Sequence, residues 1–320
     1  MTVYFAPIAR LFGDLVVSLP PLQRLIASSS DDVCLVLRST AQQGLAERIP
    51  GLAASISEPD FLRSPEFQSE RLYNLRAHPL QTDFVWGSKE FFAKYPNYGI
   101  REVIRRICDD FRIDDGQNSL EPLQYKFDKR FQEKIVLIPG STAPIKNWPQ
   151  SYWLELHQKL KQLGKESVLI GEMKENSQLK HLCEQGVPWI QTPTIIDALD
   201  AISSCAGVVS VDTGLMHLAV HQGISTVALF REYSFFARDY SHAKNIIAPA
   251  CQDNCLEGQF DFVPNANLFF PDWKSDDSFN VWSNMRCKQE ERGCMSKISV
   301  DAVMNALVEQ GILYEPSGKF

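Results

Sequence analysis

The sequence predicts a doubly wound α/β fold that is divided into two domains. Segments with strand character alternate with segments of helical periodicity along most of the chain, which is typical of parallel sheets with helices on both faces. The strand segments are continuous apolar runs, such as residues 135–138 and 206–211, as expected for strands buried on both faces. A chain of 320 residues also exceeds the usual size of a single domain.

Composition limits the classes of protein to which the chain can belong. An apolar fraction of 44% is ordinary for a globular protein, and a net charge of −7 argues against nucleic acid as the main partner. No run approaches the roughly 18 apolar residues that a membrane helix needs. Residues 1–10 lack a basic segment and a cleavage site, and are interpreted as a first strand. We therefore expect a cytoplasmic protein, which still allows peripheral contact with the inner membrane.

The first domain should begin with a strand at residues 3–8. After a loop, Asp14 opens a helix that runs to about residue 27. Because Pro20 and Pro21 fit only a first turn, the helix proper should begin near Ser18. Two further elements complete this βαβ unit, a strand at 33–37 and a helix at 42–49.

The rest of the first domain is less regular. A short strand is expected at 72–75 and an amphipathic helix at 99–111. Three arginines share roughly one face of that helix, Arg101, Arg105 and Arg106. They suit either a solvated helix face or a basic patch for a phosphorylated or carboxylated acceptor. The turn-rich residues 114–119 indicate a domain boundary region that ends near residue 134, so the first domain should comprise residues 1–133.

The second domain, residues 134–298, alternates more cleanly. Its strands are expected at 135–138, 167–171, 206–211 and 225–229, and its helices at 151–163, 175–184, 195–204 and 214–222. Residues 251–298 depart from this pattern, because aromatic and cysteine residues there stand among Asp, Asn and Pro. An insertion of this size should carry a function or a structure of its own. The remaining residues, 299–320, should contribute a C-terminal helix.

One motif in the second domain has the pattern of an anion site. The strand ending at Val211 is followed by Asp212-Thr213-Gly214 and then by a helix. A helix that begins there presents unpaired backbone N–H groups and the positive end of its dipole to a ligand. His217 lies one turn in and can face the same ligand. The alternative is a plain strand–turn–helix in which Asp212 or Thr213 acts only as an N-cap.

Two similar motifs occur earlier in the chain. Residues 135–138 end in a Gly-Ser-Thr loop that leads to Lys146, and Gly13-Asp14 stands between the first strand and its helix. In this order and at about these distances, the three motifs resemble those of the family 9 glycosyltransferases, whose best-known members are the ADP-heptose:lipopolysaccharide heptosyltransferases. The resemblance covers most of the chain and is weakest between residues 55 and 131.

The resemblance implies a fold and an activity. The fold would be GT-B, in which two Rossmann-like domains face each other across a cleft, with the C-terminal helix packing back on the first domain. The first domain would take the acceptor and the second the nucleotide sugar. The activity would be inverting transfer of a heptose or related sugar from an ADP-sugar to a lipopolysaccharide core or similar glycan.

The catalytic candidates are Asp14 and Lys146. Asp14 matches the acid that is regarded as the base of the family, and it would deprotonate the acceptor hydroxyl. The alternative is a helix N-cap, whose hydrogen bonds to backbone N–H groups would make it a poorer base. Lys146 would place a positive charge on the leaving phosphate. The alternative for Lys146 is an exposed loop residue.

The donor-binding candidates surround these motifs. Ser141 and Thr142 would donate to phosphate or ribose oxygens, while Thr213 and Gly214 would take the other phosphate. Asp212 would bind sugar hydroxyls or orient the loop, and His217 would donate to phosphate or sugar unless it is a core residue. Glu175 resembles the ribose-binding acid of the family, with Glu172 as the alternative. The chain has no Asp-x-Asp motif, which fits catalysis that requires no metal or other cofactor.

Four of the eight cysteines fall in the insertion as two pairs, Cys251-x3-Cys255 and Cys287-x6-Cys294. They suit a structural zinc or iron site, and a similar segment occurs in several members of the family. The alternative is four unrelated thiols.

Other functions remain open at this point. The first keeps the transferase but changes the sugar, or uses a protein acceptor bound through residues 256–286. The second is a non-catalytic partner protein with the same fold. A dinucleotide oxidoreductase is disfavoured, because only Gly13 of a Gly-x-Gly-x-x-Gly pattern follows the first strand.

Overall fold

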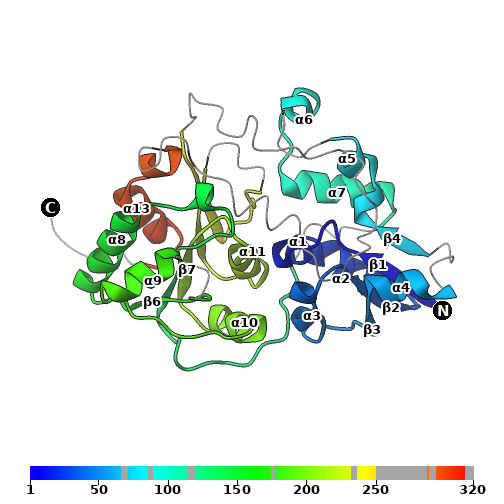
Figure 1. The fold of residues 1–320 in the computed structure, drawn as a ribbon, viewed down its shortest axis with the longest axis horizontal. Coiled ribbons are helices and arrows are strands. Elements are labelled where there is room, and N and C mark those ends of the chain that lie inside the picture. The colour runs from blue at the N-terminus through cyan, green and yellow to red at the C-terminus, as the bar shows by residue number, and fades with distance from the viewer. Residues whose placement is uncertain are drawn as a thin grey trace. The chain divides into compact units, whose positions relative to one another are not determined.

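The computed structural model describes residues 1–65, 71–84, 89–113, 120–173, 177–231, 236–249, 287 and 293–313. These residues form two compact units (Figure 1). Among the described residues, the first unit runs from Met1 to Gln124 and the second begins at Tyr125. Each unit contains one parallel sheet, as predicted.

The first unit has a four-stranded sheet in the order β3-β2-β1-β4, with every pair parallel. The strands are β1 Thr2–Ala6, β2 Asp32–Leu37, β3 Ala54–Ser57 and β4 Leu72–Asn74. The helices are α1 Phe12–Val17, α2 Leu19–Ser28, α3 Thr40–Ala46, α4 Glu58–Arg63, α5 Pro79–Thr82, α6 Lys89–Lys94 and α7 Ile100–Asp110, with a 3-10 turn at Leu75–Ala77. The sequence did not predict β3 and α4, which are each at most six residues long.

The helix that was expected from Asp14 to about residue 27 is two helices. α1 ends at Val17 and α2 begins at Leu19, with a break at Ser18. The prolines explain the break, because Pro20 and Pro21 have no N–H to continue the hydrogen bonds of α1. The Ser18 hydroxyl bridges the break by donating to the carbonyl oxygen of Asp14 at 2.6 Å.

The second unit has a five-stranded parallel sheet in the order β6-β5-β7-β8-β9. The strands are β5 Ile135–Ile138, β6 Ser167–Leu169, β7 Gly207–Val211, β8 Thr226–Phe230 and β9 Ala243–Ile247. The helices are α8 Gln150–Gln162, α9 Ser177–Glu184, α10 Ile195–Ser203, α11 Gly214–His221 and α13 Val300–Glu309, with 3-10 turns at Pro144–Lys146 and Cys294–Lys297. In Figure 1, α8, α9 and α13 lie on one side of this sheet and α10 and α11 on the other.

The C-terminal helix corrects one expectation. α13 was expected to return to the first domain, but its apolar stripe is buried in the core of the second unit. Val303 and Leu307 are fully buried in the same cluster as Leu156 and Leu160 of α8. The Trp148 indole N–H also donates to the carbonyl oxygen of Ile298, just before the helix, at 2.9 Å. Burial of this stripe against α8 is sufficient reason for the helix to stay with the second unit.

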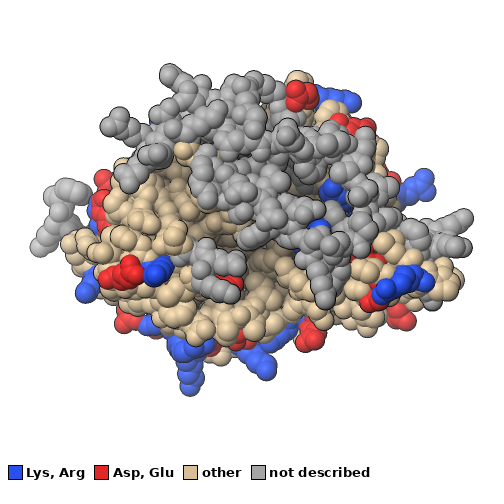
Figure 2. All heavy atoms as spheres, viewed as in Figure 1, with Lys and Arg blue, Asp and Glu red and all other residues tan. Residues whose placement is uncertain are grey.

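Two surface properties bear on partners. None of the described helices is long and apolar enough to cross a membrane. On the face shown in Figure 2, the Lys and Arg side chains of the described residues are interspersed with Asp and Glu side chains.

Candidate functional site

The candidate site of the second unit lies where the order of strands reverses. The chain passes from β5 to β6 on one side and later returns to place β7 on the other side of β5. Helices on opposite faces leave a crevice at the carboxyl ends of two such strands, where α/β proteins bind ligands. Lys146 comes from the loop after β5, and Asp212 follows β7 directly.

Lys146 and Asp212 form a buried ion pair at the carboxyl ends of these strands. Lys146 Nζ lies 2.8 Å from Asp212 Oδ2, and the two side chains are only 14% and 9% exposed. Burial by itself would raise the pKa of Asp212. The positive charge of Lys146 and the neighbouring His217 outweigh this effect and hold the pKa of Asp212 below its usual value. The carboxylate is therefore charged at neutral pH. Because the Lys146 side chain is only 14% exposed, the alternative of an exposed loop lysine at position 146 is wrong.

His217 completes the cluster from the first turn of α11. Its Nε2 lies 3.6 Å from Asp212 Oδ1, and its Nδ1 is buried without a hydrogen-bond partner in the described part of the chain. Burial lowers the pKa of His217, an effect that the carboxylate of Asp212 opposes without cancelling. The ring is thus neutral near pH 7, with one N–H to donate.

Two residues that the sequence reasoning missed support this cluster. The ring centroid of Phe236 lies 5.2 Å from Lys146 Nζ, and the ring meets that of His217 edge to face at 6.2 Å. The buried guanidinium of Arg238 donates to the carbonyl oxygen of His217 at 3.2 Å. Neither residue belongs to a recognisable motif, and only the fold of residues 236–249 alongside β8 brings them here.

The start of α11 is not capped by the side chain of its N-cap residue. Thr213 occupies the N-cap position, but its side chain makes no capping hydrogen bond, and Gly214 is the first helical residue. The backbone N–H groups of the first turn therefore rely on other acceptors, and together with the helix dipole they favour an anion. Thr213 is therefore the N-cap residue by position, as the alternative expected, but without a capping hydrogen bond from its side chain. Asp212 is not the cap residue, and its carboxylate pairs with Lys146 instead.

The Gly-Ser-Thr loop is fixed by its own polar groups. The Asn147 side chain accepts the backbone N–H of Ser141 at 3.2 Å, and the Ser141 hydroxyl accepts the N–H of Ala143 at 3.3 Å. Thr142 is exposed. These bonds lead the chain into the 3-10 turn that carries Lys146, so the lysine is held by an ordered loop.

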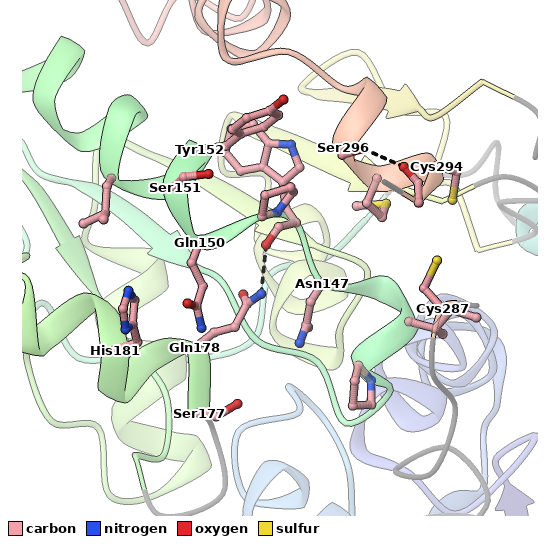
Figure 3. A pocket seen from close by; sticks show the side chains of 17 residues that line it. Asn147, Gln150, Ser151, Tyr152, Ser177, Gln178, His181, Cys287, Cys294 and Ser296 are labelled. Atoms are coloured by element: carbon pink, nitrogen blue, oxygen red, sulfur yellow. Dashed lines mark hydrogen bonds between the residues drawn. The ribbon is translucent and has the colours of Figure 1, made fainter. Parts of the chain in front are cut away.

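A pocket of about 900 Å³ lies next to this loop (Figure 3). It is lined by the loop after β5, the first residues of α8 and α9, and residues 293–296 with Cys287. The Gln178 amide, which donates to the carbonyl oxygen of Trp148 at 2.8 Å, fixes the start of α9 to this loop. Cys287 and Cys294 both line the pocket.

Asp14 occupies the corresponding place in the first unit, where the order β3-β2-β1-β4 reverses between β1 and β4. It follows β1 as the third residue of α1, and its Oδ2 accepts the backbone N–H of Leu11 at 2.8 Å. The N-cap is Leu11, so the alternative that placed Asp14 at the cap position is wrong, although the carboxylate does accept a backbone N–H as that alternative required. Buried Arg38 and Arg76, both missed by the sequence reasoning, lie within the electrostatic reach of this carboxylate.

Several predicted residues lie outside the described part of the chain. These are Glu175, Cys251 and Cys255. Glu172, the alternative to Glu175, is described and exposed. Within the described ranges, no three His, Cys, Asp or Glu side chains gather in a way that could hold a metal ion.

Comparison with known proteins identifies relatives over most of the chain. Residues 77–257 match the model of "Glycosyltransferase family 9 (heptosyltransferase)". Lipopolysaccharide heptosyltransferase 2 of Escherichia coli K12 is 29% identical over 151 residues, which are 44% of this chain and 43% of that protein. The aligned segment thus spans less than half of the relative's length.

Solved structures extend the likeness to 97% of the chain. A family 9 glycosyltransferase from Veillonella parvula is matched with a TM-score of 0.66 at 14% identity, over 96% of its chain. The iron-containing dodecameric heptosyltransferase TibC of enterotoxigenic E. coli, solved with ADP-D-beta-D-heptose, is matched with a TM-score of 0.60 at 16% identity, over 76% of its chain. At these identities the likeness shows the fold, and the predicted GT-B fold with its two Rossmann-like units is confirmed.

Proposed function

The chain belongs to glycosyltransferase family 9, and we propose that it transfers a sugar from a nucleoside diphosphate donor to an acceptor hydroxyl. The observation that carries this proposal is the buried cluster of Lys146, Asp212 and His217 beside the start of α11, which has no side-chain cap from Thr213. It combines a fixed positive charge, backbone N–H donors and a neutral imidazole. A diphosphate needs the same set of groups to be bound without a metal ion.

In this proposal the diphosphate lies between Lys146 and the first turn of α11. Lys146 neutralises the negative charge that grows on the leaving diphosphate as the glycosidic bond breaks, which is the main electrostatic requirement of the reaction. Gly214 has no side chain, so a phosphate can approach the helix N–H groups closely. Ser141 and Thr142 bind phosphate or ribose oxygens, Asp212 accepts sugar hydroxyls, and His217 donates its single N–H to phosphate or sugar.

Asp14 is the base in this proposal. It takes the proton of the acceptor hydroxyl as the oxygen attacks the anomeric carbon from the face opposite the diphosphate, so a single displacement inverts that carbon. The nearby positive charges of Arg38 and Arg76 favour the charged carboxylate that a base requires. No step of this reaction needs a metal ion or another cofactor.

The donor and acceptor are assigned by analogy with the relatives. A protein named lipopolysaccharide heptosyltransferase shares 29% identity with part of the chain, and TibC was solved with an ADP-heptose. We therefore propose ADP-heptose as the donor, a lipopolysaccharide core or similar glycan as the acceptor, and the cytoplasmic face of the membrane as the location. Glu175 is proposed to bind the ribose.

We also propose that Cys251, Cys255, Cys287 and Cys294 form a structural zinc or iron site. Two observations support it: Cys287 and Cys294 line the same pocket, and the related TibC contains iron. Thiolates suit both metals. Metal analysis of protein purified without chelator should find about one ion per chain, and Cys294→Ser should lose it. Metal-free protein of unchanged stability would refute this site.

The donor is tested by calorimetry with ADP, GDP, UDP and CMP, and with their sugar conjugates. The proposal expects selective binding of ADP and ADP-heptose, and transfer to a truncated lipopolysaccharide core detected by mass spectrometry. Selective binding of UDP or GDP would refute heptose as the sugar while keeping the site. Binding without transfer to any glycan would favour a protein acceptor or a non-catalytic partner protein, and no binding at all would refute the donor site.

A further inference from the structure

We infer that Gln42, with Arg38 and Ser39, is a positioning device for Asp14. We call these three side chains the loop clamp. They belong to the end of β2 and the start of α3, and they hold the loop of residues 7–11 that leads from β1 to Asp14. This inference rests on the proposed function, because it assigns the clamp a role in the work of the base.

The clamp binds the loop through its carbonyl oxygens. The Arg38 guanidinium donates to the carbonyl oxygen of Pro7, and the Ser39 hydroxyl donates to that of Arg10. The Gln42 amide donates to the carbonyl oxygens of Ala9 at 2.8 Å and Leu11 at 3.1 Å. A loop without regular structure is thus fixed almost residue by residue.

Gln42 is the centre of the clamp. Its side chain is fully buried, and its Oε1 accepts the backbone N–H of Arg38 at 2.9 Å while its amide nitrogen serves the loop. The residue therefore uses both ends of its amide and ties the β2–α3 connection to the β1–α1 connection. A buried amide group without hydrogen-bond partners would destabilise the fold. The bonds at both ends of the Gln42 amide therefore fix the orientation of its side chain.

The clamp reaches Asp14 through Leu11. The carbonyl oxygen of Leu11 is held by Gln42, and its N–H donates to Asp14 Oδ2 at 2.8 Å. The other end of the loop is tied as well. The Ile8 N–H donates to the Ser18 hydroxyl at 3.3 Å, and that hydroxyl donates to the carbonyl oxygen of Asp14 at 2.6 Å. Hydrogen bonds thus connect both the side chain and the backbone of Asp14 to the clamped loop.

The clamp also places charge. Arg38 is fully buried and ion-paired with Glu58, the first residue of α4, and it donates to the side chain of Asn74 at the end of β4. Burial lowers the pKa of Arg38 to about 10, against the opposing charges of Glu58 and Asp14, so the guanidinium stays charged at neutral pH. Together with Arg76 in the turn after β4, Arg38 favours the ionised form of Asp14.

The test compares Gln42→Met with Gln23→Met. Both glutamines are buried in the first unit and donate to a backbone carbonyl. Among the described residues, the Gln23 amide donates to the carbonyl oxygen of Glu121 at 2.8 Å and not to the loop of residues 7–11. Methionine keeps the length of the side chain and removes its polar atoms. Ser39→Ala removes a single bond of the clamp and should have a smaller effect in the same direction.

Gln42→Met should lower kcat about 10- to 100-fold, because small displacements of a catalytic group cost that much. The calorimetric Kd for ADP should stay within about twofold of wild type, because the proposed donor groups lie in the other unit. The acid limb of the pH profile of kcat should move to higher pH, because the Leu11 N–H that favours the charged form of Asp14 is no longer held in place. Gln23→Met should change none of these quantities. A Gln42→Met enzyme with wild-type kcat and pH profile, altered only in Tm, would overturn the inference.

A second measurement does not depend on activity. Hydrogen exchange at the amides of residues 8–11, including the Leu11 N–H that binds Asp14, should become faster in Gln42→Met and not in Gln23→Met. Unchanged exchange would overturn the clamp even in an active enzyme. If the wild-type protein transfers no sugar and the exchange still quickens in Gln42→Met, the clamp stands as a structural feature and the proposed function fails.

Discussion

Replacing Lys146 by methionine should destabilise the second unit far more than an ordinary loss of one ion pair. The substitution leaves the carboxylate of Asp212 buried beside a neutral His217, with the positive charge of Lys146 gone. The side chain of Asp212 is 9% exposed, so water cannot replace the lysine. Removing one partner of a buried pair typically costs about 3–5 kcal/mol.

The magnitude can be read as a change in Tm. For a domain of this size, 1 kcal/mol corresponds to ~2–4 °C, so a loss of about 3 kcal/mol should lower Tm by ~6–12 °C at pH 7. Removing both charges, as in Lys146→Met with Asp212→Asn, should restore most of this loss, because no uncompensated charge remains. The matched control is Lys159→Met. Lys159 Nζ pairs with Asp301 at 2.6 Å in the same unit, but the two side chains are 34% and 78% exposed, so water can solvate the charge that is left and Tm should stay near that of wild type.

The pH dependence gives a second test of the same argument. In wild type, burial raises the pKa of Asp212 but Lys146 and His217 outweigh it, so the folded pKa lies below the unfolded one. The ion pair therefore contributes stability above about pH 4, the unfolded value, and loses it as pH falls through the folded pKa. In folded Lys146→Met, the buried carboxyl of Asp212 should take up a proton as the pH falls, which removes the uncompensated charge. The difference in Tm from wild type should consequently shrink between pH 7 and pH 4.

Thermal unfolding followed by circular dichroism across this pH range measures both effects. A Lys146→Met protein that is as stable as Lys159→Met at pH 7 would refute the buried pair. A difference in Tm that stays constant with pH would refute the assignment of the cost to Asp212.

Two other predictions concern the base and the packing of the C-terminal segment. Asp14→Asn should lower kcat by about 10²–10⁴-fold, the usual contribution of a general base, while the calorimetric Kd for ADP stays unchanged; loss of both would indicate a structural role instead. Gly207→Ala should destabilise the second unit by about 1–3 kcal/mol, because the new methyl group would lie 2.7 Å from two side-chain carbons of Ile312. Combining it with Ile312→Ala should recover part of the loss of Tm, and a Gly207→Ala protein as stable as wild type would contradict the packing of Ile312 on β7.

The sequence was sufficient to find the residues of the donor cluster but not their neighbours. Asp212 and Lys146 follow continuous apolar runs, and polar residues that follow buried parallel strands are expected at a ligand-binding edge. Their contact also requires β5 and β7 to be adjacent, which is a non-local pairing. The resemblance to family 9 supplied that information. Arg238 and Phe236 precede β9, a partly exposed edge strand whose sequence, Ala-Lys-Asn-Ile-Ile, lacks a strand periodicity.

The surroundings of Asp14 show a different limit of prediction from the sequence. Asp14 was found because it stands at a strand-to-helix turn, but Gln42 gave no signal, since a glutamine in a short helix is ordinary on any surface. Arg38 could have been noticed, because it follows the apolar run of β2 as Asp212 follows that of β7. What the sequence cannot show is that the carbonyl groups of the loop of residues 7–11 rely on side-chain donors. That requirement appears only when the path of the loop is known, and it explains why Gln42 is fully buried.

The ion pair of Lys146 with Asp212 also affects how a diphosphate can bind. An unpaired buried lysine would attract the ligand strongly but would be costly to maintain in the empty site. With Asp212 already at 2.8 Å, the lysine exchanges or shares its partner when phosphate arrives, so its net contribution to ground-state affinity is small. Its charge becomes more valuable as negative charge grows on the leaving diphosphate, whereas the charge of Asp212 does not change. The pair therefore favours the transition state over the bound donor, which is the condition for raising kcat rather than lowering KM. On this argument Lys146→Met should reduce kcat by a larger factor than it raises the Kd for the intact sugar donor.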